Sequence, residues 1–139
     1  MPARAGEIRF YVDASALGLG KALERARYDV VHPGHFHASP LLQDDTDDVW
    51  MPEVAKRGWI AIGRDKRIRT RPGEKELFAR HGLRVFRIVG TKKMSTWDEV
   101  VRLAALWDEL EQTLIDRPDG PWFMEIRARS IVEVPLPTS

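Results

Sequence analysis

The sequence predicts one domain with a three-layer α/β fold, in which a mainly parallel sheet is flanked by helices and a C-terminal β-hairpin is added. The chain has 139 residues, a length typical of a single domain. Strand-like and helix-like segments alternate along it, which favours parallel strands joined by helical crossovers. The run at residues 59–62 is wholly apolar, as expected for a strand buried on both faces.

The composition excludes several classes of protein. The chain has no cysteine, which rules out disulfide scaffolds, zinc ribbons and thiol enzymes. Phosphate-binding glycine motifs and the GxSxG nucleophile motif are also absent. No apolar run approaches the ~20 residues of a membrane span, and residues 1–7 lack the apolar core of a signal peptide. We therefore expect a cytoplasmic protein without membrane partners, folded as one domain over residues 1–139 with a frayed tail at 135–139.

The N-terminal half begins with a strand that ends in a carboxylate. Apolar and polar residues alternate over residues 8–12, and Asp13 follows directly. Gly58 is placed to end the second helix, whose start Asp47 or Asp48 could cap, although Pro52 could delay regular helix to its own position. In chain order, the predicted elements are a strand at 8–12, a helix at 15–26, a strand at 28–31, a loop at 32–46, a helix ending near 57 and a strand at 59–62.

The C-terminal half contains the longest predicted helix. Thr96 and Glu99 form a capping box at its start, and apolar residues follow at steps of three and four. This stripe consists of Trp97, Val100, Val101, Ala104, Trp107, Leu110 and Leu114. The tryptophans of the stripe, like Trp59, are therefore expected in the core. The other predicted elements are a helix at 72–81, a strand at 85–89, a turn at 116–121 and the hairpin strands Trp122–Ile126 and Ile131–Val134.

Aspartates occur at or near the ends of predicted strands, where open parallel sheets bind ligands. Asp13 follows the first strand, Asp65 follows the strand at 59–62, and a cluster of Asp44, Asp45, Asp47 and Asp48 precedes the helix between them. Crowded carboxylates repel one another unless a cation lies among them, and oxygen ligands suit Mg²⁺ or Mn²⁺. The alternative is that these aspartates cap helices or form turns. Which member of the cluster would face a metal stays open.

Basic residues surround Asp65. Arg64, Lys66, Arg67, Arg69 and Arg71 lie in one segment, and their side chains suit the phosphates of a nucleic-acid backbone. The alternative is a solvated loop with surface charges. The segment has no aromatic residue for stacking, so reading of specific bases is not supported.

Three histidines of the loop at 32–46 form a weaker candidate site. His32, His35 and His37 could ligate a transition metal. No other ligand pattern accompanies them. A polar or packing role in the loop is the favoured interpretation.

Several segments resemble PIN domains. Residues 10–17 are similar to the opening strand of that family, in which an aspartate is followed two residues later by a serine or threonine. Residues 47–54, 58–60 and 64–69 resemble the PIN-like domains grouped with VapC-type toxins of prokaryotic toxin–antitoxin systems. The likeness extends from Ile8 to about Ile126.

The resemblance implies a metal-dependent endoribonuclease that uses Mg²⁺ or Mn²⁺. It assigns Asp13, Asp47 and Asp65 as catalytic residues and metal ligands, with Ser15 as the supporting hydroxyl. The family's fourth acid is absent after the strand at 85–89, where Thr91 is a possible substitute. The expected partners are an RNA substrate, held by Lys66, Arg67 and Arg69, a protein antitoxin and, in a homodimer, a second copy of the chain. The alternative is a catalytically silent PIN-like module that binds protein or RNA.

Overall fold

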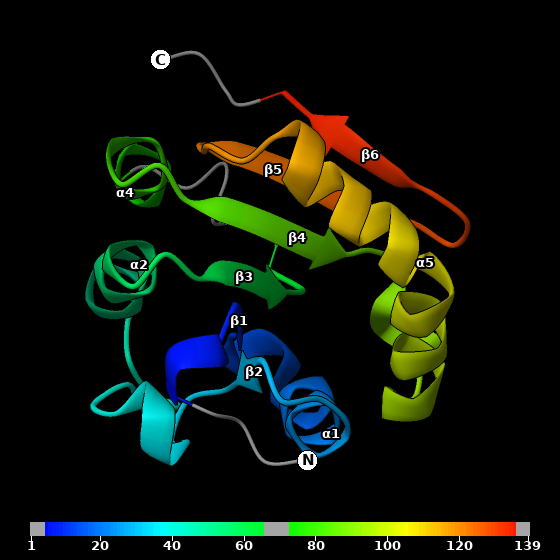
Figure 1. Ribbon diagram of the computed structural model, residues 1–139, viewed down its shortest axis with the longest axis horizontal. Helices are drawn as coiled ribbons and strands as arrows, with labels where there is room; N and C mark the ends of the chain where they lie inside the picture. The colour runs from blue at the N-terminus through cyan, green and yellow to red at the C-terminus, as the bar shows by residue number, and fades with distance from the viewer. Residues whose placement is uncertain (1–4, 66–72, 136–139) are drawn as a thin grey trace.

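A mixed β-sheet forms the centre of the computed structural model (Figure 1), which describes residues 5–65 and 73–135. Six strands in these residues pair in the order β2-β1-β3-β4-β5-β6. The first five are parallel, and β6 pairs antiparallel with β5. The strands are β1 (Phe10–Val12), β2 (Val30–Val31), β3 (Ile60–Gly63), β4 (Arg84–Ile88), β5 (Trp122–Ile126) and β6 (Ile131–Val134). This arrangement confirms the predicted α/β fold and its terminal hairpin.

Helices cover both faces of the sheet. The α-helices are α1 (Leu17–Ala26), α2 (Asp47–Lys56), α4 (Glu74–Arg80) and α5 (Thr96–Asp116). Short 3₁₀ turns are η1 (Ala5–Glu7), η2 (Ala14–Ala16), η3 (Phe36–Ala38) and η4 (Thr91–Lys93). Figure 1 shows α1 and α5 on one side of the sheet and α2 and α4 on the other. The sheet therefore has two hydrophobic cores, one under each pair of helices.

The interior strand β1 contributes to both cores. Phe10 and Val12 pack under α1 and α5, whereas Tyr11 packs under α2 and α4. Tyr11 stacks against the rings of Trp50 and Trp59, with ring centroids 5.7 and 6.3 Å away. The alternating sequence places Tyr11 on the same face as polar Arg9, which suggests an exposed face. Every residue of β1 is nevertheless buried, because the strand has a partner strand on each edge and helices on each face.

The strand order places a topological switch point beside β1. The chain passes from β1 to β2 on one side and later returns to β3 on the other. Val12 pairs with Ile62, and the amide of Asp13 donates to the carbonyl of Ile62 at 3.0 Å. The carboxyl ends of β1 and β3 thus lie together, and this is where sheets of this type bind ligands.

The start of α5 differs from the prediction. The capping box consists of Ser95 and Asp98, with both hydrogen bonds at 3.1 Å, one residue before the expected Thr96–Glu99 pair. Glu99 is instead fully buried. Trp97, expected in the core, is 71% exposed. It lies two residues before Glu99, about 200° away around the helix and therefore on the opposite face. Val101 and Ala104 of the expected stripe are exposed as well. Val100, Trp107, Leu110 and Leu114 do pack into or against the core, as predicted.

Other boundaries agree closely with the sequence. Helix α2 begins at Asp47 with Thr46 in the N-cap position, and it continues through Pro52 rather than starting there. Gly58 follows its end with φ of 72°, as predicted. The Gly20 position in α1 is buried, and a Cβ there would lie 3.0 Å from the Cβ of His32, so glycine allows the helix to approach the sheet.

Several predictions lie outside the described residues. These are the RNA-binding roles of Lys66, Arg67 and Arg69, the expected helix start at Pro72 and most of the C-terminal tail. In the described ranges, no helix combines the length and apolar character needed to cross a bilayer.

Candidate active site

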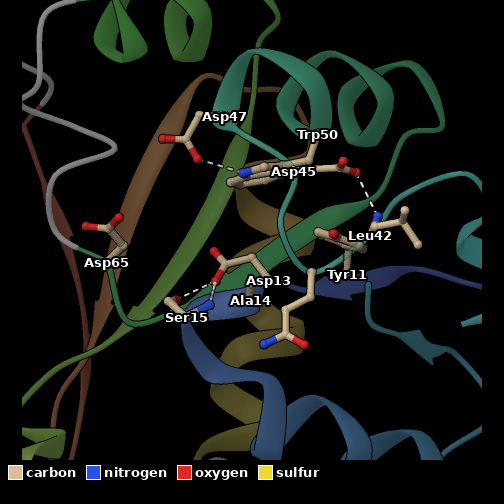
Figure 2. Close-up of a pocket in the computed structure, with 10 residues that line it drawn as sticks. Tyr11, Asp13, Ala14, Ser15, Leu42, Asp45, Asp47, Trp50 and Asp65 are labelled. Carbon is tan, nitrogen blue, oxygen red and sulfur yellow. Dashed lines mark hydrogen bonds between the residues drawn. The ribbon is translucent and has the colours of Figure 1, made fainter. Parts of the chain in front are cut away.

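A polar pocket opens at the switch point between β1 and β3 (Figure 2). Its volume is about 130 Å³, and its walls include Asp13, Asp45, Asp47 and Asp65. All three aspartates that the PIN resemblance assigns therefore border one pocket, as does Ser15. The pocket draws its acids from the end of β1, the loop before α2, the first turn of α2 and the residues after β3.

Asp13 is the most buried acid of the pocket, with 4% of its surface exposed. Its Oδ1 accepts hydrogen bonds from the backbone amide of Ser15 at 2.8 Å and from the Ser15 hydroxyl. These bonds cap the short turn η2. Its Oδ2 is buried without a hydrogen-bond partner. One oxygen thus has a structural role, whereas the other has no hydrogen-bond partner among residues 5–65 and 73–135.

Gly63, the last residue of β3, makes room for this carboxylate. A Cβ at Gly63 would lie 2.3 Å from Oδ2 of Asp13 and 2.8 Å from its Oδ1. These distances are shorter than any ordinary contact, so no other residue fits without displacing Asp13. A glycine at the end of an apolar strand is the sequence signal for such a close approach.

The pKa of Asp13 is raised from 3.8 to about 6, mainly because the carboxylate is buried. The hydrogen bonds from Ser15 oppose this shift, and the charges of Asp65 and Asp47 add to it. Burial also raises the pKa of Tyr11, with the charges of Asp13 and Asp45 as smaller causes. A cation in the pocket would relieve the unfavourable charge on Asp13.

Asp47 occupies the first turn of α2, where its negative charge favours the helix. The indole Nε1 of Trp50 donates to its Oδ1 at 2.6 Å, as Figure 2 shows. The sequence left open which aspartate of the cluster would face a metal. Asp45 also borders the pocket, and its Oδ2 accepts from the amide of Leu42 at 2.7 Å. Asp44 and Asp48 do not line this pocket, and Asp48 accepts from the Thr46 hydroxyl.

The residue before Asp65, Arg64, makes contacts that the sequence did not indicate. Arg64, grouped above with phosphate-binding cations, instead forms a two-fold hydrogen bond with buried Glu99 at 2.7 and 2.6 Å. Its backbone amide donates to the Ser15 hydroxyl at 2.8 Å. In the sequence, only one feature could have indicated that Glu99 is buried. It lies four residues before Leu103, and both residues are on the buried face of α5.

Thr91 and the histidines lie elsewhere. Thr91 begins η4 after β4 and does not line the pocket. His35 caps η3 by accepting from the amide of His37 at 3.0 Å, and its Nε2 lies 3.2 Å from Glu24. His32 Nδ1 lies 2.9 Å from the carbonyl of Pro33. These contacts support the loop role that the sequence favoured for the histidines.

The chemistry of the pocket fits a hard divalent cation. Its acids offer carboxylate oxygens, and Oδ2 of Asp13 lacks a partner. Among the described residues, hydrogen bonds hold one oxygen of Asp13 and one of Asp47 in orientation. Across residues 5–65 and 73–135, however, no three acidic or histidine side chains are already grouped closely enough to hold an ion. The acids surround the pocket without forming a ready-made cage, so ligation requires side-chain adjustment.

The fold and pocket define an α/β protein with an acidic site at the switch point of its sheet. A protein-family model described as "PIN like domain" matches residues 8–90. Because this match covers more than half of the chain, the protein belongs to the PIN-like domain family, whose members are commonly nucleases. The matched segment includes Asp13, Asp47 and Asp65 and ends before α5. No curated protein and no solved structure gives a significant match.

Proposed function

We propose that the protein is a divalent-metal-dependent ribonuclease that hydrolyses RNA phosphodiester bonds. The observation that carries this proposal is the buried Asp13 carboxylate, which has one oxygen without a partner in a pocket shared with Asp47 and Asp65. Placing an ionised carboxylate there is unfavourable for folding alone. Such an unfavourable arrangement is typical of a functional site.

Asp13, Asp47 and Asp65 would hold Mg²⁺ or Mn²⁺. A bound divalent ion supplies positive charge that stabilises a phosphoryl group under attack and promotes ionisation of water. Ser15 keeps the Asp13 carboxylate oriented, and Trp50 does the same for Asp47. The stacked rings of Tyr11 and Trp50 form one wall of the pocket beside these carboxylates.

Basic residues next to Asp65 in the sequence and at the carboxyl edge of the sheet support a polyanionic substrate. Lys66, Arg67 and Arg69 follow Asp65 in the sequence, outside the described residues. Lys92 and Lys93 are exposed in η4, just beyond the carboxyl end of β4, which neighbours β3. Exposed Trp97 is four residues from Lys93. Aromatic and basic side chains together are typical of surfaces that bind single-stranded nucleic acid.

Cleavage of a labelled single-stranded RNA by the purified protein tests this function. We expect cleavage with Mn²⁺ or Mg²⁺, none with EDTA, and none by Asp13→Asn with either ion. Asp48→Asn is the matched control, because Asp48 belongs to the same acidic cluster but does not line the pocket. Equal activity of Asp13→Asn and the wild type would refute the assignment of Asp13.

A second candidate is a PIN-like module that binds RNA or protein without cleaving it. Two observations favour it: the acids do not form a ready-made metal site among the described residues, and Thr91 does not line the pocket. RNA binding without cleavage, under conditions in which Mn²⁺ binding is measured, would support this alternative.

We further propose that the enzyme is a VapC-type toxin that acts in the cytoplasm and is neutralised by a protein antitoxin. The basis is the similarity of residues 47–54 and 64–69 to that group. Expression of the wild type should arrest growth, whereas expression of Asp13→Asn to the same level should not. Equal growth of the two cultures would contradict the toxin role and leave the nuclease assay as the test of chemistry.

A further inference from the structure

A buried ion pair joins α5 to the segment that carries Asp65. The Glu99 carboxylate is fully buried, and it accepts from Nε of Arg64 at 2.7 Å and from Nη2 at 2.6 Å. Two parallel bonds between a guanidinium and a carboxylate fix the orientation of both groups. The first turn of α5 therefore holds the Arg64 side chain in one place.

The backbone of Arg64 is held on both sides. Its amide donates to the Ser15 hydroxyl at 2.8 Å, and its carbonyl accepts from Nε of Arg87 at 3.0 Å. Arg87 is itself paired with Glu125 at 3.2 Å. The carbonyl of Arg64 and the amide of Asp65 belong to one planar peptide unit, so the bond from Arg87 also orients the backbone amide of Asp65.

These contacts connect Asp65 to Asp13 through one hydroxyl. The Ser15 oxygen accepts from the Arg64 amide and donates to Oδ1 of Asp13. The spacing of the two acids therefore depends on Arg64, whose side chain is anchored by Glu99. We propose that the Arg64–Glu99 pair positions Asp65 relative to Asp13, which makes Glu99 a positioning residue for the acidic pocket; this inference rests on the metal-dependent function proposed above.

The alternative is that the pair serves folding alone. A buried ion pair is weak support for that role, because apolar residues of similar volume often stabilise a protein at least as well. Apolar residues would not hold the Arg64 guanidinium in a fixed orientation. Glu99 also lies outside the segment that matches the PIN-like family, so its role cannot be attributed to that matched segment.

Glu99→Gln and Asp29→Asn form a matched pair of variants. Asp29 is as buried as Glu99 and also has a two-fold bond to an arginine, Arg27, at 2.8 and 3.1 Å. It precedes β2 and thus lies at the opposite, amino end of the parallel strands. Both variants remove one buried carboxylate charge that is paired with arginine, and Asp29 has a second arginine, Arg9, at 3.4 Å. Only Glu99→Gln should alter the pocket.

The measurements are Mn²⁺ affinity by titration and hydrogen exchange of the Arg64 amide in metal-free protein. We expect Glu99→Gln to weaken Mn²⁺ binding about ten-fold or more, as is typical for residues that orient metal ligands. It should also speed exchange at Arg64 relative to amides of β4. Asp29→Asn should lower the melting temperature without changing either quantity. If Glu99→Gln is too unstable to purify, Arg64→Lys, which keeps the charge but not the two-fold bond, should show the same two effects.

Two results would overturn the positioning role. One is unchanged Mn²⁺ affinity and Arg64 exchange in Glu99→Gln; the other is an equal effect of Asp29→Asn on both. Failure of the wild type to bind Mn²⁺ would instead refute the proposed metal-dependent function. Exchange at Arg64 in metal-free protein would then decide the positioning role by itself.

Discussion

Replacing Asp13 by asparagine should stabilise the metal-free protein at neutral pH. The pKa of Asp13 is raised from 3.8 to about 6, and at ~1.4 kcal/mol per pH unit the ionised carboxylate costs about 3 kcal/mol. Asparagine keeps an oxygen for the bonds from Ser15, but it places an amide without a partner beside Gly63, which costs about 1–2 kcal/mol. The expected net gain is about 1–2 kcal/mol.

This gain corresponds to a measurable change in melting temperature. A chain of 139 residues has an unfolding entropy of about 0.3 kcal/mol/K. Asp13→Asn should therefore melt about 3–7 °C above the wild type at pH 7–8 in EDTA. Addition of Mn²⁺ should stabilise the wild type and leave the variant unchanged, because the variant lacks the carboxylate that holds the ion.

The pH dependence of stability independently tests whether Asp13→Asn stabilises the protein. The folded-state pKa of Asp13 exceeds the unfolded value, so the folded protein binds more protons between pH 3.8 and about 6. Wild-type stability from this group therefore falls as pH rises through that window, and the penalty is complete above it. The advantage of the variant should shrink as pH falls from 7 to 4. When Asp13 is protonated in both states, the variant should be less stable than the wild type by the cost of the unpartnered amide, about 1–2 kcal/mol.

Thermal melts of both proteins from pH 4 to pH 8 in EDTA provide the assay. Asp48→Asn is the control, because this exposed side chain should change stability by less than about 0.5 kcal/mol. A variant less stable than the wild type at pH 7–8, or a difference that does not vary with pH, would refute the reasoning.

Three further predictions concern the surroundings of Asp13. Gly63→Ala should lower the free energy of unfolding by about 1–3 kcal/mol in a denaturant titration, since its Cβ would overlap the Asp13 carboxylate. Trp50→Phe should weaken Mn²⁺ binding by roughly ten-fold in a calorimetric titration, because it removes the donor that orients Asp47; unchanged affinity would exclude that role. Replacing both Lys92 and Lys93 by alanine should reduce the slope of log affinity against log salt for single-stranded RNA by about 1.4, whereas Lys56→Ala at the far end of α2 should not.

The order of elements could be predicted because it depends on local patterns. The apolar run at residues 59–62 and the glycine after α2 identify their elements without knowledge of the rest of the chain. The pairing of Asp13 with Asp65 at one edge also follows from local information, since the carboxyl ends of parallel strands share an edge. The start of α5 could not be predicted in this way. Ser95 and Thr96 are both residue types that cap helices, and local patterns do not show whether Glu99 or Trp97 faces the sheet.

That choice depends on a partner distant in sequence. Glu99 is buried because Arg64, 35 residues earlier, offers two hydrogen bonds to it. Hydropathy patterns assign a glutamate to the surface and a tryptophan to the core, and here both assignments are wrong. The grouping of Arg64 with phosphate-binding cations fails for the same reason. A run of basic residues does not reveal which of them has a buried partner.

The two interpretations of Asp13, as a turn cap and as a ligand for a cation, are compatible in the structure. Capping requires one acceptor, and Oδ1 fills that role through Ser15. The same bonds fix the carboxylate plane and direct Oδ2 against Gly63, where it has no partner. The capping interaction therefore also fixes the position of the second oxygen, which the proposed cation would contact. An aspartate followed two residues later by a hydroxyl is thus a meaningful pattern, because the turn that it stabilises also orients the acid.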